Sequence, residues 1–155
     1  YKRPIWIYVG RVAVEKNIKA FLDLDLEGTK VIIGKGPNLN NLKKKYPNDF
    51  FLGEKTNGEL ASHFASSDVF VFPSKTDTFG IVVLESLSCG TPVAAYPVPG
   101  PKDILGGSKI DTLDQDLKTS ALKALKVNRE DCLEFAKKYS WEETARIFYN
   151  NISPN

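Results

Sequence analysis

The chain of 155 residues has few of the side chains that mark metal and redox sites. It has a single histidine, His63, and two cysteines, Cys89 and Cys132, so the usual zinc-binding clusters are missing. Both cysteines fall in helical patterns, which favours reduced thiols over a disulfide. The chain has no Gly-x-x-x-x-Gly-Lys-Ser/Thr loop, which excludes an ATP-type phosphate loop. We therefore expect no metal site and no cofactor.

Long apolar runs and a strong charge are also missing. No apolar run approaches the roughly 18 residues of a membrane span, and no signal peptide is visible. A net charge of +2 is too small to indicate nucleic acid or an anionic membrane as the main partner. The length suits one domain with its own core. Because the chain has no methionine and begins with Tyr1, we expect a piece of a longer protein or a chain cut at its front.

What the chain does have is an alternation of short apolar runs with helical patterns. Strands are predicted at 5–9, 31–33, 50–52, 69–72 and 92–95, with a short sixth at 109–111. Helical spacing is found at 17–24, 39–46, 57–65 and 80–89. Wholly apolar strands that alternate with helices predict an α/β fold, a Rossmann-like parallel sheet of about six strands with helices on both faces.

The last third of the chain is predicted to be helical, after a rigid turn at 97–101. Leu117, Ala121 and Leu125 recur at helical spacing, and a further helix follows around Cys132. Ser140 and a glutamate three residues later form a capping-box pattern before a final helix at 144–152. In a parallel α/β sheet, ligands bind beyond the carboxyl ends of the strands, which directs attention to the loops at those ends.

The most informative of these loops lies in the stretch 74–92, SKTDTFGIVVLESLSCGTP. Gly80 and Ile81 start a helix there and could offer free backbone N–H groups to a phosphate. Glu85 lies about five residues further along, roughly 7–8 Å at a rise of ~1.5 Å per residue, which is the reach from a pyrophosphate to ribose hydroxyls. Asp77 would lie on the other side, near a donor sugar. Spacing alone leaves open that Asp77 only caps the helix and that Glu85 is a solvated or paired acid.

Two further features follow other predicted strands, and two lie on predicted helices. Arg11 and Lys16, after the first strand, could neutralise a diphosphate, or they could form an ordinary surface pair with Glu15. The segment 34–37 is similar to a dinucleotide fingerprint but lacks its third glycine, so a nucleoside-binding turn and a plain turn both remain open. His63 is predicted to lie on the outer face of a helix, and the lysines at 43–45 to form a solvated helix face.

Together these residues resemble the C-terminal, donor-binding domain of a retaining glycosyltransferase of family 4 (group 1) with the GT-B fold. The resemblance covers nearly the whole chain and rests on YVGRVAVEKN, IIGKGP, SSDVFVFPS, TDTFGIVVLESLSCGTPV and YSWEETARIFYN. The middle segment is the specific one, because the family carries Glu-x7-Glu there. This chain has Asp77 and Glu85 at the two glutamate positions, and the shorter Asp77 puts the identity of the sugar in question.

The resemblance implies roles for single residues. Arg11 and Lys16 would stabilise the diphosphate as leaving group, and Asp77 would bind the hydroxyls of the transferred sugar. The other implied substrate-binding residues are Gly10, Phe79, Gly80, Ile81 and Glu85, the last on the ribose. Similar enzymes retain the anomeric configuration and need no metal.

The resemblance also implies what lies outside the chain. We expect residues 1–155 to be one nucleotide-sugar-binding domain, with the N-terminal acceptor domain missing. The expected partners are a UDP- or GDP-linked sugar and a sugar or lipid-linked acceptor, and not nucleic acid. We expect a cytoplasmic location, at the cytoplasmic membrane face if the missing domain binds there. The competing hypotheses are a non-catalytic nucleotide-binding module and a sugar-nucleotide epimerase or hydrolase.

Overall fold

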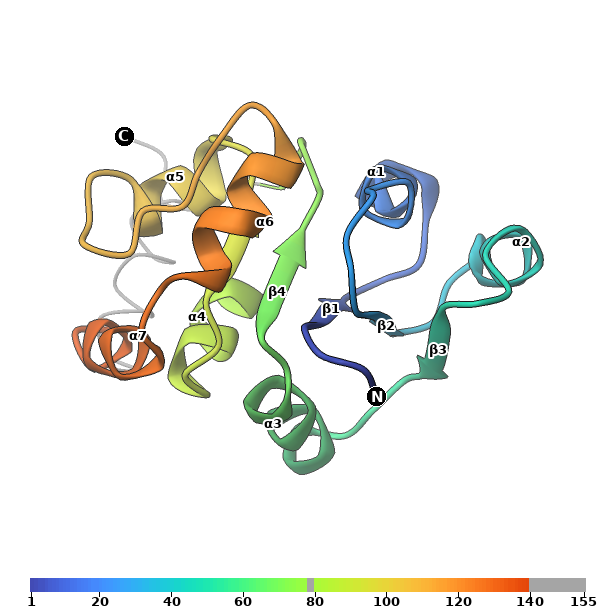
Figure 1. The fold of residues 1–155 in the computed structure, drawn as a ribbon, viewed down its shortest axis with the longest axis horizontal. Helices are drawn as coiled ribbons and strands as arrows, with labels where there is room; N and C mark the ends of the chain where they lie inside the picture. Colours follow the sequence, from blue (N-terminus) through green and yellow to red (C-terminus); the bar gives the residue numbers. More distant parts are fainter. Residues whose placement is uncertain (78–79, 140–155) are drawn as a thin grey trace, which may run out of the picture.

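A parallel sheet with helices on both faces organises the chain (Figure 1). The computed structural model describes residues 1–77 and 80–139. In chain order the elements are β1 (Ile5–Val9), the 3-10 helix η1 (Val14–Lys16), α1 (Ile18–Leu22), β2 (Thr29–Ile33), α2 (Leu39–Lys45), β3 (Phe50–Gly53), α3 (Asn57–Ser66), β4 (Val69–Phe72), α4 (Ile81–Ser88), β5 (Val93–Ala95), α5 (Pro99–Leu105), α6 (Leu117–Leu125) and α7 (Arg129–Ala136).

The sheet has five strands in the order β3-β2-β1-β4-β5, all parallel. The prediction of a sixth strand at 109–111 was wrong. This segment is a turn in which Asp111 accepts a hydrogen bond from the Gly107 backbone N–H at 2.8 Å, so the chain curls back after α5. Ile110 is apolar because it is buried in the core, not because it pairs with a neighbouring strand.

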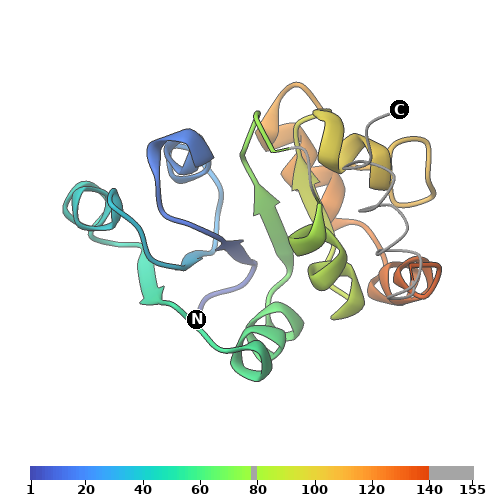
Figure 2. The same cartoon turned by 180° about the vertical axis from the view of Figure 1, so that it is seen from behind.

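The strands are apolar throughout because helices cover both faces of the sheet. Along β1, Ile5, Ile7 and Val9 pack with residues of α3, α4, α5 and α7. Trp6 and Tyr8 face the other way and pack with residues of α1, α2 and α6. Figures 1 and 2 show α1 and α2 on one side of the sheet, and α3, α4 and α7 on the other. The prediction of a doubly covered parallel sheet is therefore confirmed.

Most predicted element boundaries are within two residues of the structure, and two segments differ in kind. The segment 97–101 does not remain a turn, because α5 begins at Pro99, where a proline suits the first helical position. The helix predicted at 17–24 is shortened to α1 and is preceded by η1. The capping box at Ser140 and the final helix lie outside the described residues. No helix in the described part of the chain has both the length and the apolar character that a membrane crossing requires.

The loops at the carboxyl edge are packed against each other backbone to backbone. The Gly34 N–H donates to the Gly53 carbonyl at 2.8 Å, and the Val12 N–H donates to the Lys35 carbonyl at 2.9 Å. A Cβ at Gly34, whose φ is 143°, would lie 1.8 Å from the Gly10 carbonyl oxygen. A Cβ at Gly36 would lie 2.3 Å from the Val12 carbonyl oxygen. The two glycines of the 34–37 segment are therefore needed for the close approach of the loops.

Candidate functional site

The strand order reverses direction between β1 and β4, so the loops that follow these two strands diverge at the carboxyl edge. Such a switch point is where open α/β sheets bind ligands. The β1 loop carries Arg11 and Lys16, and the β4 loop carries Asp77. The fold therefore brings together two groups of predicted site residues from separate parts of the sequence.

Lys16 and Asp77 meet directly across this point. The Lys16 Nζ donates to the Asp77 Oδ1 at 2.7 Å, and the two side chains are 27% and 24% exposed. Asn17, the next residue, donates from its carboxamide to the Pro73 carbonyl at 3.0 Å and so joins the same two loops. In the free chain, then, the cation and the carboxylate are each other's partner.

Arg11 is held at its backbone but not at its guanidinium. The Tyr8 hydroxyl donates to the Arg11 carbonyl at 2.9 Å. Burial, reinforced by the charges of Asp77 and Glu15, raises the pKa of Tyr8, so the hydroxyl stays a neutral donor. The guanidinium lies 3.6 Å from Glu15 with both side chains exposed, an ion pair of little strength. It forms the surface pair that the sequence left open, yet it can turn toward an anion at small cost.

The glycines at the start of the β1 loop and at the end of the β4 loop have packing roles. The Gly10 N–H already donates to the Ile33 carbonyl at 3.0 Å, and a Cβ there would lie 2.8 Å from the Tyr8 Oη. Gly80 is buried, and a Cβ on it would lie 2.2 Å from the Ile104 Cδ1 of α5. Ile81 follows at the first turn of α4 with its side chain 48% exposed. Phe79 lies outside the described residues.

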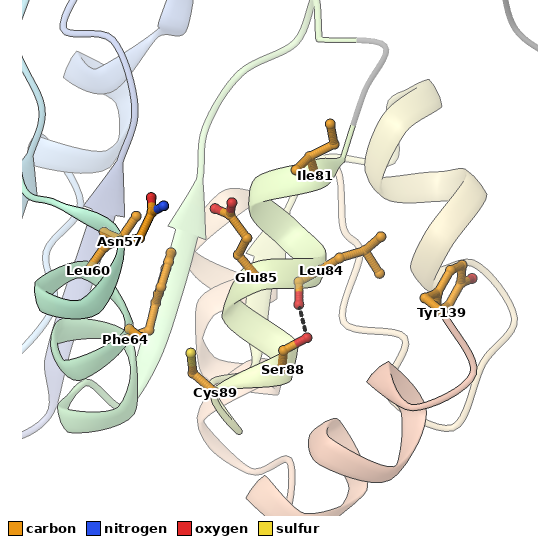
Figure 3. A pocket seen from close by; sticks show the side chains of 10 residues that line it. Asn57, Leu60, Phe64, Ile81, Leu84, Glu85, Ser88, Cys89 and Tyr139 are labelled. Atoms are coloured by element: carbon orange, nitrogen blue, oxygen red, sulfur yellow. Dashed lines mark hydrogen bonds between the residues drawn. The ribbon is translucent and has the colours of Figure 1, made fainter. Parts of the chain in front are cut away.

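Glu85 lies in a pocket between α3 and α4, about 490 Å³ in volume. Figure 3 shows its carboxylate directed toward α3, where Asn57, Leu60 and Phe64 form the opposite wall. The pocket is also lined by Ala61, Ile81, Leu84, Ser88, Cys89 and Tyr139. Partial burial among these mostly apolar walls raises the pKa of Glu85. With the residues that the structure describes, Glu85 forms neither an ion pair nor a hydrogen bond, so its oxygens are available to a ligand.

A second pocket, about 710 Å³, lies over the loops that follow β1, β2 and β3. It is lined by Val9, Gly10, Arg11, Ile33, Gly34, Lys35, Gly36, Pro37, Glu54, Lys55 and Leu60. Lys35 and Glu54 form an exposed ion pair at 2.6 Å on its rim. Because Leu60 lines both pockets, they flank the first turns of α3.

Sequence reasoning missed the contribution of α3. Asn57 lines the pocket around Glu85 and Leu60 lines both pockets, because β3 belongs to the same parallel sheet and places the start of α3 at the carboxyl edge. The signal was present, since the loop after each predicted strand ends at that edge. His63 is half-buried on α3 and lines neither pocket, and the lysines at 43–45 are exposed on α2. Within residues 1–77 and 80–139, no three His, Cys, Asp or Glu side chains are grouped to hold a metal ion.

Comparison with known proteins gives one family. The model of the family described as glycosyl transferases group 1 matches residues 1–138. The sulfoquinovosyl transferase SQD2 of Arabidopsis thaliana is 39% identical over 109 residues, which are 67% of this chain and 21% of that protein. A GDP-mannose-dependent alpha-mannosyltransferase of Mycobacterium tuberculosis is 38% identical over 105 residues, 66% of this chain and 28% of that protein.

Solved structures agree on the fold. A mutant of S. aureus TarM, crystallised with Fondaparinux, alpha-GlcNAc-glycerol and UDP, aligns with a TM-score of 0.72 at 20% identity, over 95% of this chain and 35% of that one. Sucrose-phosphate synthase from Thermosynechococcus elongatus aligns with a TM-score of 0.71 at 23% identity, over 96% of this chain and 44% of that one. The chain thus spans less than half of either structure, and under a third of the two relatives above.

Proposed function

The chain belongs to the glycosyl transferases of group 1 and has the fold of a GT-B glycosyltransferase domain, and from this we propose that it is the C-terminal, donor-binding domain of a family 4 enzyme. The proposed donor is a sugar linked to a nucleoside diphosphate, bound at the carboxyl edge between the β1 and β4 loops. The proposed reaction transfers that sugar to an acceptor with retention of anomeric configuration and without a metal ion.

The observation that best supports this proposal is the meeting of Lys16 and Asp77. They are 61 positions apart in sequence, yet their charged atoms lie 2.7 Å apart at the switch point of the sheet. A cation for a diphosphate and a carboxylate for sugar hydroxyls are the two groups that a nucleotide sugar requires at its central linkage. A partly buried position increases the strength of both interactions relative to open water.

The pockets supply room for the rest of the donor. In the proposed binding mode the diphosphate lies at Arg11 and Lys16. The ribose hydroxyls donate hydrogen bonds to the Glu85 carboxylate. The nucleoside then extends along Leu60, which lines both pockets. Asp77 faces the transferred sugar. The apolar wall around a few polar groups is typical of small-molecule sites.

This arrangement accounts for the chemical step in terms of charge. When the bond between the anomeric carbon and the diphosphate oxygen breaks, the electron pair stays on the leaving diphosphate. The guanidinium of Arg11 and the ammonium of Lys16 would stabilise this added negative charge, and such electrostatic stabilisation is a large part of catalysis. In the proposal these two cations take the role that a divalent metal has in other transfer enzymes.

The acceptor and the complete active site belong to the proposed longer protein. GT-B enzymes work in the cleft between two domains. We therefore propose that an N-terminal domain binds a sugar or lipid-linked acceptor. A cytoplasmic location, with peripheral membrane contact through that domain, is part of the same proposal. The similar M. tuberculosis enzyme is named for GDP-mannose and the S. aureus structure contains UDP, so both bases are candidates. We expect the isolated domain to bind nucleotide but to transfer sugar slowly or not at all.

Isothermal titration calorimetry with UDP, GDP and their sugars tests the proposal. The expected result is submillimolar binding of at least one nucleotide, lost in Arg11→Ala and in Glu85→Ala. Lys43→Ala and Glu134→Ala, which change exposed charges on α2 and α7, are matched controls that should bind as the unmodified chain does. If no nucleotide binds, the proposal is wrong. Binding without transfer by the longer protein would favour a regulatory module, and hydrolysed or epimerised sugar would favour the third hypothesis.

A further inference from the structure

Asn17, the residue after Lys16, has an unusual backbone conformation. Its φ of 56° and ψ of 31° are in the left-handed region, and it is the one non-glycine residue of the described chain with a positive φ. It ends η1 and precedes the first residue of α1, directly after Lys16. Asparagine tolerates this conformation better than most residues with a side chain, while glycine adopts it freely.

The side chain of Asn17 does not do what an asparagine at this position usually does. At the residue before a helix, an asparagine commonly accepts a hydrogen bond from the first turn. Here the side chain makes no capping hydrogen bond to α1. Instead the carboxamide donates to the Pro73 carbonyl at 3.0 Å, 56 positions away at the end of β4. Its polar group is used across the site and not within its own helix.

This hydrogen bond lies beyond the last residue pair of the ladder between β1 and β4. β1 and β4 are paired at two positions, Trp6 with Val69 and Ile7 with Phe70. The ladder between β1 and β4 has no pair after these, so it does not extend into the loops that carry Lys16 and Asp77. The bond from Asn17 to Pro73 supplies a fixed point between them, one residue after Lys16 and four residues before Asp77.

We propose that Asn17 is a positioning residue for the diphosphate of the donor, an inference that rests on the proposed function. Its carboxamide holds the backbone of Lys16 at a set distance from the β4 loop, so that the ammonium meets the ligand in place. At the other end of the loop, the Tyr8 hydroxyl holds the Arg11 carbonyl. With both ends held, the phosphate-binding loop is preorganised, and the ligand gains affinity because less order is lost on binding.

The variant Asn17→Gly separates the effect of the side-chain bond to Pro73 from the effect of the left-handed backbone at residue 17. Glycine adopts the left-handed backbone freely and removes the carboxamide, and with it the bond to Pro73. A net hydrogen bond of about 1 kcal/mol corresponds to roughly a fivefold change in affinity. We expect Asn17→Gly to bind inorganic pyrophosphate, and whichever of UDP and GDP the chain binds, about fivefold more weakly. The corresponding nucleoside, uridine or guanosine, should bind within about twofold of the unmodified chain.

Two further variants complete the experiment. Asn48→Gly, in an exposed turn between α2 and β3, is the matched control, since it adds the same glycine without touching the site. In a Lys16→Ala background, Asn17→Gly should have no further effect on pyrophosphate binding, because the group that it positions is gone. A purely structural role of Asn17 would instead lower the melting temperature and leave the ratio of diphosphate to nucleoside affinity unchanged.

The outcomes divide cleanly. The inference is overturned if Asn17→Gly binds diphosphate as the unmodified chain does, if it loses nucleoside and diphosphate affinity equally, or if the two substitutions act additively. A failure of the proposed function is distinguishable, because the unmodified chain would then bind no nucleotide at all. Calorimetry on the folded chains, with melting curves recorded for each variant, supplies all of these readings.

Discussion

Removing the charge of Asp77 should strengthen, not weaken, the binding of a nucleoside diphosphate. In the free chain Asp77 neutralises Lys16 at 2.7 Å, so an incoming diphosphate competes with this carboxylate for the ammonium. Asp77→Asn has nearly the same shape and retains a carbonyl oxygen, but it no longer holds Lys16 by charge. The diphosphate then meets a cation without a competing anion.

The expected magnitude follows from the exposure of the pair. An exposed ion pair contributes about 0.2–1 kcal/mol and a hydrogen bond to a charged group about 1.5–3 kcal/mol. Because the Lys16 and Asp77 side chains are only 27% and 24% exposed, we take about 1 kcal/mol, the upper end of the range for exposed pairs. Affinity for inorganic pyrophosphate and for the bound nucleoside diphosphate should therefore rise about fivefold in Asp77→Asn. The free energy of unfolding should fall by about the same 1 kcal/mol, since Lys16 loses its partner.

Calorimetric titrations at low and high ionic strength measure this effect. The difference between the unmodified chain and Asp77→Asn should be smaller at high salt, because salt screens the competition. Glu134→Gln, an exposed acid on α7, is the control and should leave affinity unchanged. Weaker or equal pyrophosphate binding by Asp77→Asn would refute the competition. In the longer protein the same variant should lose sugar transfer, because the proposed contact of Asp77 with the transferred sugar is gone.

Two other predictions concern the pocket and the loops. Because burial raises the pKa of Glu85 above its ordinary 4.5, its charged form costs stability when the pH lies above that raised pKa. Glu85→Gln should therefore melt at a higher temperature than the unmodified chain at about pH 8, and this gap should close as the pH falls through the raised pKa toward about 4.5; a gap that does not change with pH would contradict the assignment. Gly34→Ala should lower the free energy of unfolding by more than about 3 kcal/mol in urea titrations, because its Cβ would lie 1.8 Å from the Gly10 carbonyl oxygen. Gly58→Ala in α3, where a Cβ has no neighbour within 4 Å, should leave stability equal or higher by up to about 1 kcal/mol, and equal losses in both variants would show that loop contact is not the cause.

The sheet and its layers could be predicted from sequence because short, wholly apolar runs alternate with segments of helical spacing. Five apolar runs became the five strands, and their apolar character on both faces indicated the helical cover. The turn at Ile110 could not be separated from a strand, because a buried apolar residue in a turn has the same local composition as one in a strand. The start of α5 at Pro99 depends on which residue adopts the extended conformation before it, and that choice is made by tertiary packing.

The candidate site was predictable at the level of loops but not of contacts. The rule that ligands lie beyond the strand ends was enough to bring Arg11, Lys16 and Asp77 to one edge. That Lys16 pairs with Asp77 and Arg11 with Glu15 depends on side-chain positions, which the spacing of residues along the chain does not determine. The wall formed by Asn57 and Leu60 requires the strand order, because only a β3 next to β2 brings α3 across from Glu85.

The strand order also divides the candidate site between two consecutive parts of the chain. β1, β2 and β3 lie to one side of the switch point, and β4 and β5 to the other. The pocket of about 710 Å³ is lined wholly by residues of the first part, at the ends of β1 and β2, in the loops that follow the three strands, and in α3. Substitutions at Lys35, Glu54 or Lys55 can therefore change this lining without replacing Lys16 or Asp77. The first part of the chain thus sets what this pocket admits, while the charged contact at the centre joins the two parts, with Lys16 from the first and Asp77 from the second.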